Sequence, residues 1–90
     1  MKYYKTGVLI PEEALKEIRK KGNVSAVVEG IGRMYIDKHL EENTEVFKKV
    51  STVVSVSEQF IKEIHSKRKE RVREFLSKAI TQWWKEYKDA

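Results

Sequence analysis

The stretch VSVSEQFIKEI, residues 54–64, changes its hydrophobic period in the middle. Up to Ser57, apolar and polar residues alternate, which is the pattern of a strand with one buried face. After Ser57 the apolar residues are Phe60, Ile61 and Ile64, which is helical spacing, and Ser57 stands where a helix N-cap belongs. The stretch therefore predicts a strand that runs directly into a capped helix.

A second copy of this pattern lies earlier in the chain, in VLIPEEALKEI at residues 8–18. With an offset of 46 residues, five of the eleven aligned positions are identical: Val8 and Val54, Glu12 and Glu58, Lys16 and Lys62, Glu17 and Glu63, and Ile18 and Ile64. Self-similarity at a fixed spacing is the signature of a repeated structural unit. The sequence therefore predicts that one strand-and-helix unit occurs twice.

The match continues after a two-residue insertion, which raises the offset to 48. The matched apolar positions are Val24 and Val72, Val27 and Phe75, Val28 and Leu76, Ile31 and Ala79, Tyr35 and Trp83, and Ile36 and Trp84. Each series falls on one stripe of a helix. We therefore expect strand, helix, helix in residues 1–42, a linker at 43–48, and the same three elements in residues 49–90.

Local chemistry indicates where the helices begin and end. Pro11 needs no N–H partner at a first helical turn, and Glu12 suits the positive end of the helix dipole. Gly22 ends this first helix, and Asn23 can cap the next one.

The second unit has a less obvious turn. HSKRKER, residues 65–71, contains neither Gly nor Pro, so one continuous helix over residues 57–87 is an alternative. A break is favoured because the apolar stripe lapses for seven residues between Ile64 and Val72. That gap is too long for one buried helix face.

One strand-helix-helix unit cannot bury its own apolar face. A lone strand has no partner for its backbone groups, and a two-stranded hairpin is marginal without helices packed on it. Two units solve both problems if their strands pair and their helices share one core. The predicted fold is mainly α with one two-stranded antiparallel ribbon, in the order β-α-α-β-α-α, and the two units form a pseudo-dimer.

The repeated unit resembles the ribbon-helix-helix family of DNA-binding transcriptional regulators, which includes the Arc and MetJ type repressors. The resemblance rests on a short alternating strand, a helix opened by Pro or Ser followed by Glu, a short turn and a longer amphipathic helix, at residues 5–40 and 51–88. Tandem versions similar to this chain are found among regulators of archaeal viruses and relaxosome accessory proteins of conjugative plasmids. The resemblance implies double-stranded DNA as partner, without a cofactor, and leaves open self-association of monomers or dimers on the DNA.

The outward face of the ribbon is the expected base-reading surface, because a two-stranded ribbon fits the major groove of B-DNA. If Thr6, Val8, Ile10, Thr52, Val54 and Val56 face the core, the outward residues are Lys5, Gly7, Leu9, Ser51, Val53 and Ser55. Lys5 can donate to guanine, the serines to several bases, and Leu9 or Val53 can touch a thymine methyl. Three of the six offer no hydrogen bond, so DNA shape is expected to supply part of the specificity. The alternative is that all six are merely exposed strand residues.

The resemblance also implies that the N-terminus of each second helix holds a DNA phosphate, where free N–H groups and the helix dipole favour an anion. Asn23 and Ser25 in the first unit and Arg71 and Arg73 in the second occupy these places. They are flanked by Lys20, Lys21, Lys67, Arg68 and Lys69. The alternative is a solvated basic turn without a ligand.

Composition agrees with an anionic partner. The formal charge is +5; residues 1–45 hold eight basic and eight acidic residues, whereas residues 46–90 hold eleven and six. Solvation of helix faces is the alternative explanation of this asymmetry. The absence of cysteine excludes disulfides, and no apolar run is long enough for a membrane span or a signal peptide, so a cytoplasmic location is expected, in the host cytoplasm if the protein is viral.

The remaining conspicuous residues indicate no active site. Trp83 and Trp84 are adjacent, so only one of them can face the core squarely. Gly30 and Gly32 lie inside an expected helix, which indicates close contact with another helix. His39 and His65 lack the partners that a zinc site requires, and no nucleophile and base or paired carboxylates are apparent, so neither a metal nor an enzymatic activity is expected.

Three functions from different classes follow. A sequence-specific DNA-binding regulator of transcription is favoured, with a relaxosome accessory role as a variant. An antitoxin-like module, which uses a ribbon-helix-helix base and a disordered tail to bind a toxin, fits less well because only three residues follow Tyr87. A structural protein with one long helix would require residues 57–87 to be continuous.

Overall fold

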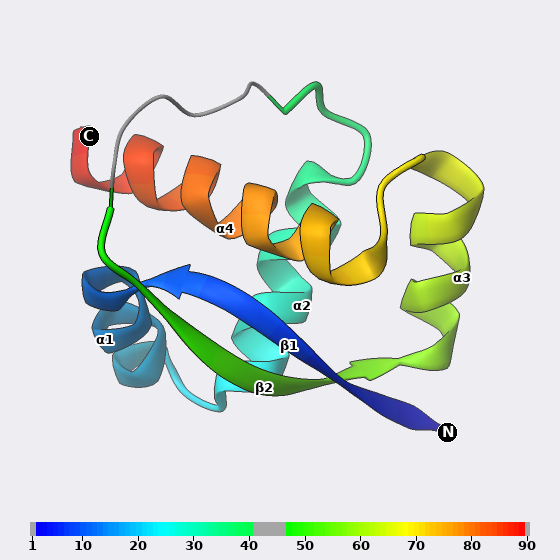
Figure 1. Ribbon diagram of the computed structural model, residues 1–90, viewed down its shortest axis with the longest axis horizontal. Helices are drawn as coiled ribbons and strands as arrows, with labels where there is room; N and C mark the ends of the chain where they lie inside the picture. The colour runs from blue at the N-terminus through cyan, green and yellow to red at the C-terminus, as the bar shows by residue number, and fades with distance from the viewer. Residues whose placement is uncertain (1, 41–46, 90) are drawn as a thin grey trace.

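The computed structural model describes residues 2–40 and 47–89, and these residues form four helices and one two-stranded sheet. In chain order the elements are β1 (Tyr3–Pro11), α1 (Glu12–Lys21), α2 (Val24–Tyr35), β2 (Lys49–Ser57), α3 (Glu58–Lys67) and α4 (Val72–Asp89) (Figure 1). The mainly helical class with a two-stranded antiparallel ribbon is confirmed. Most of the expected linker at residues 43–48 falls outside the described residues.

The break in the second half is also confirmed, because α3 ends at Lys67 and α4 begins at Val72. One continuous helix over residues 57–87 is therefore wrong. Both expected side-chain caps are present: the Asn23 Oδ1 accepts from the Ala26 N–H at 3.1 Å, and the Ser57 Oγ accepts from the Phe60 N–H at 3.3 Å. Each satisfies a backbone donor that the first turn of a helix leaves without a partner.

The ribbon buries the face that the alternation predicts. Val8 and Val54 are 1% exposed, and Ile10 and Val56 are fully buried. The strands pair antiparallel, with Lys5 opposite Ser55, Gly7 opposite Val53 and Leu9 opposite Ser51. The six outward residues of the sequence analysis therefore lie on one face as three cross-strand pairs.

The pairing register of the two strands is symmetric under the same offset of 46 residues that relates the two sequence repeats. When each residue is exchanged for its counterpart 46 positions away, the pair Lys5–Ser55 becomes Ser51–Leu9, and the pair Gly7–Val53 becomes itself. Two backbone hydrogen bonds are exchanged in the same way, since the Glu12 N–H donates to the Lys48 carbonyl at 2.8 Å and the Glu58 N–H donates to the Lys2 carbonyl at 3.0 Å. The ribbon backbone and the starts of α1 and α3 thus have matching local geometry in both halves.

The two halves contribute to one core. Its largest fully buried side chains come from all four helices and both strands, and include Phe60, Phe75, Ile10, Ile18, Val28 and Leu76. In Figure 1, α1 lies at one end of the ribbon and α3 at the other, while α2 and α4 pack against the strands and against each other. Neither half could cover these apolar side chains alone, which explains why the unit is present twice.

The two helix glycines differ. A Cβ on Gly32 would lie 2.9 Å from the Leu76 Cδ2 and 2.9 Å from the Phe60 Cε2, so α2 approaches its neighbours closely there. A Cβ on Gly30 would meet nothing within 4 Å, so the expected helix contact at Gly30 is wrong. Of the two tryptophans, Trp84 is 8% exposed and faces the core, whereas Trp83 is only partly buried, as expected from their adjacency.

Candidate nucleic-acid interface

The outward face of the ribbon is exposed and chemically mixed. Leu9 and Val53 are 48% and 66% exposed, and Lys5 and Ser51 are exposed beside them. Gly7 is half-buried, and a Cβ added there would meet only the Ser51 Oγ, at 4.0 Å. The central pair therefore carries one apolar side chain opposite open space. This is a surface on which a second molecule can approach the backbone closely.

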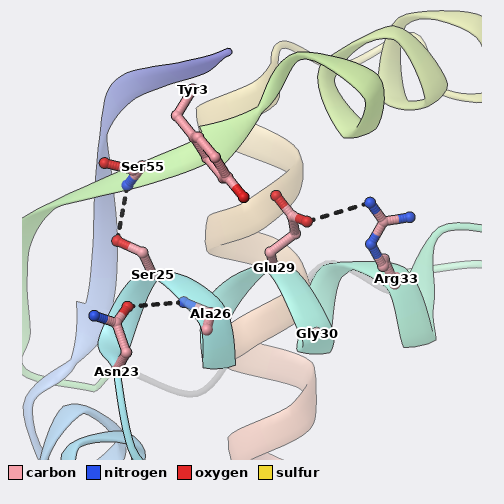
Figure 2. Close-up of a pocket in the computed structure, with 8 residues that line it drawn as sticks. All are labelled: Tyr3, Asn23, Ser25, Ala26, Glu29, Gly30, Arg33 and Ser55. Atoms are coloured by element: carbon pink, nitrogen blue, oxygen red, sulfur yellow. Dashed lines mark hydrogen bonds and ion pairs between the residues drawn. The ribbon is translucent and has the colours of Figure 1, made fainter. Parts of the chain in front are cut away.

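A groove runs along each side of this face, between the ribbon and the first turns of a second helix. We call the first the α2 groove; it has a volume of about 590 Å³ and is lined by Tyr3, Asn23, Ser25, Ala26, Glu29, Gly30, Arg33 and Ser55 (Figure 2). We call the second the α4 groove; it has a volume of about 340 Å³ and is lined by Gly7, Val8, Leu9, Ser51, Arg73, Glu74, Ser77 and Lys78.

The two grooves occupy equivalent places in the two halves. By the offset of 48, Ser25 and Ala26 correspond to Arg73 and Glu74, and by the offset of 46, Ser55 corresponds to Leu9. All of these residues line one groove or the other. The fold therefore builds one kind of groove twice, but with different side chains.

Serine hydroxyl groups attach the second helices to the ribbon edges. The Ser25 Oγ accepts from the Ser55 N–H at 2.9 Å, which Figure 2 shows, and the Ser77 Oγ accepts from the Leu9 N–H at 3.1 Å. Ser55 and Leu9 are counterparts under the offset of 46, so the same strand position is held in both halves. These bonds hold the first turn of α2 and the second turn of α4 beside the ribbon.

The α2 groove holds polar groups and one neutralised carboxylate. The Glu29 Oε1 accepts from the Ser57 N–H at 2.8 Å, and its Oε2 lies 3.2 Å from the Arg33 Nη2. Figure 2 shows the Tyr3 ring reaching across this groove toward Glu29. The first N–H groups of α2, next to Asn23, lack partners within the helix, as at every helix start. The groove therefore offers donors but little net positive charge.

The α4 groove has more positive than negative charge, because Arg73 and Lys78 line it together with one exposed carboxylate, Glu74. Arg71 and Arg73 are exposed, and neither is in an ion pair within the described part of the chain. Lys78 lines the groove one turn later, 4.0 Å from Glu70. Lys69 is also exposed at this turn. Free guanidinium groups next to a helix N-terminus are suited to an oxyanion such as phosphate.

Arg68, expected beside a phosphate, instead braces the protein. Its Nη1 donates to the carbonyls of Ile36 at 3.3 Å and Lys38 at 2.7 Å, and its Nε and Nη2 lie 3.2 and 3.0 Å from the Glu70 carboxylate. The guanidinium also lies 4.9 Å from the Phe75 ring centre, and the side chain is 12% exposed. The hydrogen bond that Arg68 donates to the Glu70 carboxylate is the main reason why the pKa of Glu70 is lowered. We therefore leave Arg68 out of the candidate interface.

Three expected lysines also lie outside both grooves. Lys20 pairs with Glu17 at 3.3 Å, and Lys21 lies 5.3 Å from the centre of the Tyr87 ring. Lys67 pairs with Asp37 at 3.3 Å. These side chains lie at the C-terminal ends of α1 and α3 and line neither groove, so the structure does not bring them together with Asn23, Ser25 and Arg73.

Sequence reasoning missed Ser77 and Lys78. Ser77 holds the ribbon edge, and both residues line the α4 groove. Ser77 follows Arg73 by four positions and Lys78 follows Glu74 by four positions, so each lies on one helix face with a residue of the first turn of α4. That spacing is the signal that could have identified them.

Within the part of the chain that the structure describes, no group of His, Asp or Glu side chains is arranged to hold a metal ion. None of the helices there combines the length and the apolar character needed to cross a bilayer. No family model, curated protein or solved structure matches the chain.

Proposed function

We propose that the chain is a sequence-specific, double-stranded DNA-binding regulator of transcription, a tandem ribbon-helix-helix protein whose two halves act as a pseudo-dimer. The observation that carries the proposal is one exposed ribbon face with three outward residue pairs, flanked on both sides by grooves at the starts of α2 and α4. The exchange of paired residues by the offset of 46 supports the pseudo-dimer.

The ribbon enters the major groove, which has room for two strands and displays distinct donors, acceptors and methyl groups for each base pair. Lys5 donates to the O6 and N7 of guanine, and Ser51 and Ser55 pair with several bases. Leu9 and Val53 contact thymine methyl groups. The three residues without hydrogen-bonding side chains leave part of the selectivity to the shape of the DNA.

The starts of α2 and α4 hold the backbone phosphates on either side. At α2 the contact comes from helix N–H groups together with Asn23 and Ser25. At α4, Arg71, Arg73 and Lys78 add positive charge at the same place. Contacts of this kind position a protein on DNA without reading its sequence.

The test is duplex binding by the intact chain. A random duplex library is selected for bound fragments, and the preferred fragment is compared with a scrambled duplex by fluorescence anisotropy. Lys5→Ala, Ser51→Ala and Ser55→Ala should each weaken binding to the preferred fragment more than to the scrambled one, because base contacts specify and phosphate contacts only position. Equal losses on both duplexes would show that the ribbon is not the reading surface.

A further inference from the structure

The pairing of the ribbon backbone is unchanged when the two halves are exchanged by the offset of 46, but the outward side chains change. The offset of 46 exchanges Lys5 with Ser51 and Leu9 with Ser55. One end of the outward face therefore presents Lys5 opposite Ser55, and the other end presents Leu9 opposite Ser51. Two identical subunits would present identical ends, whereas this single chain presents two different ones.

From this difference we infer that the protein reads a non-palindromic site with two unlike halves and binds it in one fixed orientation. The inference rests on the proposed function and deepens it. The ammonium group of Lys5 donates only, so its end of the ribbon requires acceptors, which guanine supplies at O6 and N7. The Leu9 side chain has no hydrogen-bonding group, so its end favours the thymine methyl. The serine at each end tolerates several bases.

The grooves strengthen this polarity. The α2 groove includes Ser55 and Tyr3, so it flanks the Lys5 end, where the Glu29 carboxylate and Arg33 balance each other. The α4 groove includes Leu9 and Ser51, so it flanks the opposite end, where Arg73 and Lys78 outnumber the one carboxylate, Glu74. The positive charge that can contact a base, on Lys5, is thus at one end of the ribbon. The positive charge that can contact the DNA backbone is at the other end. Sequence discrimination is concentrated in the half-site under Lys5, and the half-site under Leu9 is held mainly by its phosphates.

Two variants that make the two ends of the outward face alike test the inference, and both leave the central pair of Gly7 and Val53 unchanged. Ser51→Lys with Ser55→Leu gives both strands the Lys and Leu of β1, and Lys5→Ser with Leu9→Ser gives both strands the serines of β2. All four side chains point away from the core, and the hydrogen bonds at Leu9 and Ser55 use their backbone N–H groups. Circular dichroism melting should therefore show both variants folded.

The parent and both variants are each selected against a random duplex library. The parent should yield a non-palindromic motif with guanine in one half. The Ser51→Lys and Ser55→Leu variant should yield a palindrome built from that guanine half. The Lys5→Ser and Leu9→Ser variant should lose the guanine preference, with at least about fivefold less discrimination at that base pair.

Orientation is measured separately. The chain has no cysteine, so Gln59→Cys, on the exposed first turn of α3 near the Lys5 end, takes a single iron chelate for cleavage of the preferred DNA. Cleavage on one flank only is the expected result. Equal cleavage on both flanks, or a palindromic parent motif, would overturn the inference while leaving DNA binding intact. Failure to bind any duplex would overturn the proposed function and the inference together.

Discussion

The turn between α1 and α2 and the turn between α3 and α4 occupy equivalent places in the fold but are built differently. The first is short and depends on Gly22, whose φ of 141° is the one positive φ in the described chain, and on the Asn23 cap. The second is two residues longer and depends on the Arg68 side chain, which fastens it to the end of α2. A special backbone conformation closes the first turn, and a partly buried guanidinium closes the second.

The difference teaches that the basic residues of the second turn have two separate roles. Arg68 and Glu70 satisfy each other inside the protein, whereas Lys69, Arg71 and Arg73 remain exposed toward the surface. At the first turn, Lys20 pairs with Glu17 and Lys21 lies over the Tyr87 ring, so both contact α1 or α4 and not the start of α2. Within the described residues, exposed arginines without an ion pair at the start of a second helix are therefore a feature of the second half.

The largest expected effect is on stability. Arg68→Ala removes the hydrogen bonds to Ile36, Lys38 and Glu70 and should lower the free energy of unfolding by about 2–3 kcal/mol. Urea denaturation followed by circular dichroism measures this. Arg71→Ala is the matched control, because an exposed arginine in the same turn should change the free energy of unfolding by less than about 0.5 kcal/mol. Equal stabilities of the two variants would mean that the brace contributes nothing.

The stability difference between the parent protein and Arg68→Ala should also depend on pH. The Arg68 guanidinium lowers the pKa of Glu70 in the folded state. A carboxyl group with a lowered folded pKa stabilises the protein above its unfolded pKa, about 4.3, and loses that contribution as the pH falls through the folded value. The stability difference between the parent and Arg68→Ala should therefore be larger at pH 7 than at pH 3. A difference that does not change with pH would contradict the ion pair.

The next effect is on DNA affinity. Changing both Arg71 and Arg73 to Ala should weaken binding to any duplex by about 10- to 100-fold, and should flatten the plot of log K against log salt by about 0.9 for each lost phosphate contact. Sequence preference should survive. Lys20→Ala with Lys21→Ala is the matched control, because it removes equal charge outside both grooves, and it should have a much smaller effect. Equal losses in the two double variants would show that only net charge matters.

Features that depend on local chemistry could be predicted from the sequence. Alternation within each strand placed Leu9 and Val53 outside and Val8 and Val54 inside, and the capping chemistry of Asn23 was correct. The internal repeat added the pairing partner of each strand, because each unit had an apolar face that only the other could cover. These inferences need only neighbours in the chain or the repeat itself.

Features that depend on distant contacts could not be predicted in this way. Arg68 acts on Ile36 and Lys38, about thirty residues away, and nothing in HSKRKER distinguishes it from the exposed Lys69. Periodicity likewise could not separate Gly32, which packs against Leu76, from Gly30, which meets open space. A run of like charges shows that a turn is basic, but only the packing around it shows which charges remain available.

The smallest expected effect comes from a substitution that makes the charge of the α2 groove more similar to the charge of the α4 groove. Glu29→Gln keeps an acceptor for the Ser57 N–H but removes one negative charge beside the first phosphate position, while Arg33 retains its ion pair with Glu63 at 3.2 Å. Water and salt weaken the interactions between exposed charges, so the effect should be small: duplex binding should tighten by about 2- to 5-fold, and its salt dependence should steepen slightly. Glu17→Gln is the matched control, because it makes the same change in net charge next to Lys20, outside both grooves. Anisotropy titrations at two salt concentrations compare the two variants. If Glu29→Gln gains no more affinity than Glu17→Gln, the α2 groove lies away from the DNA backbone, and the two halves differ in contact as well as in charge.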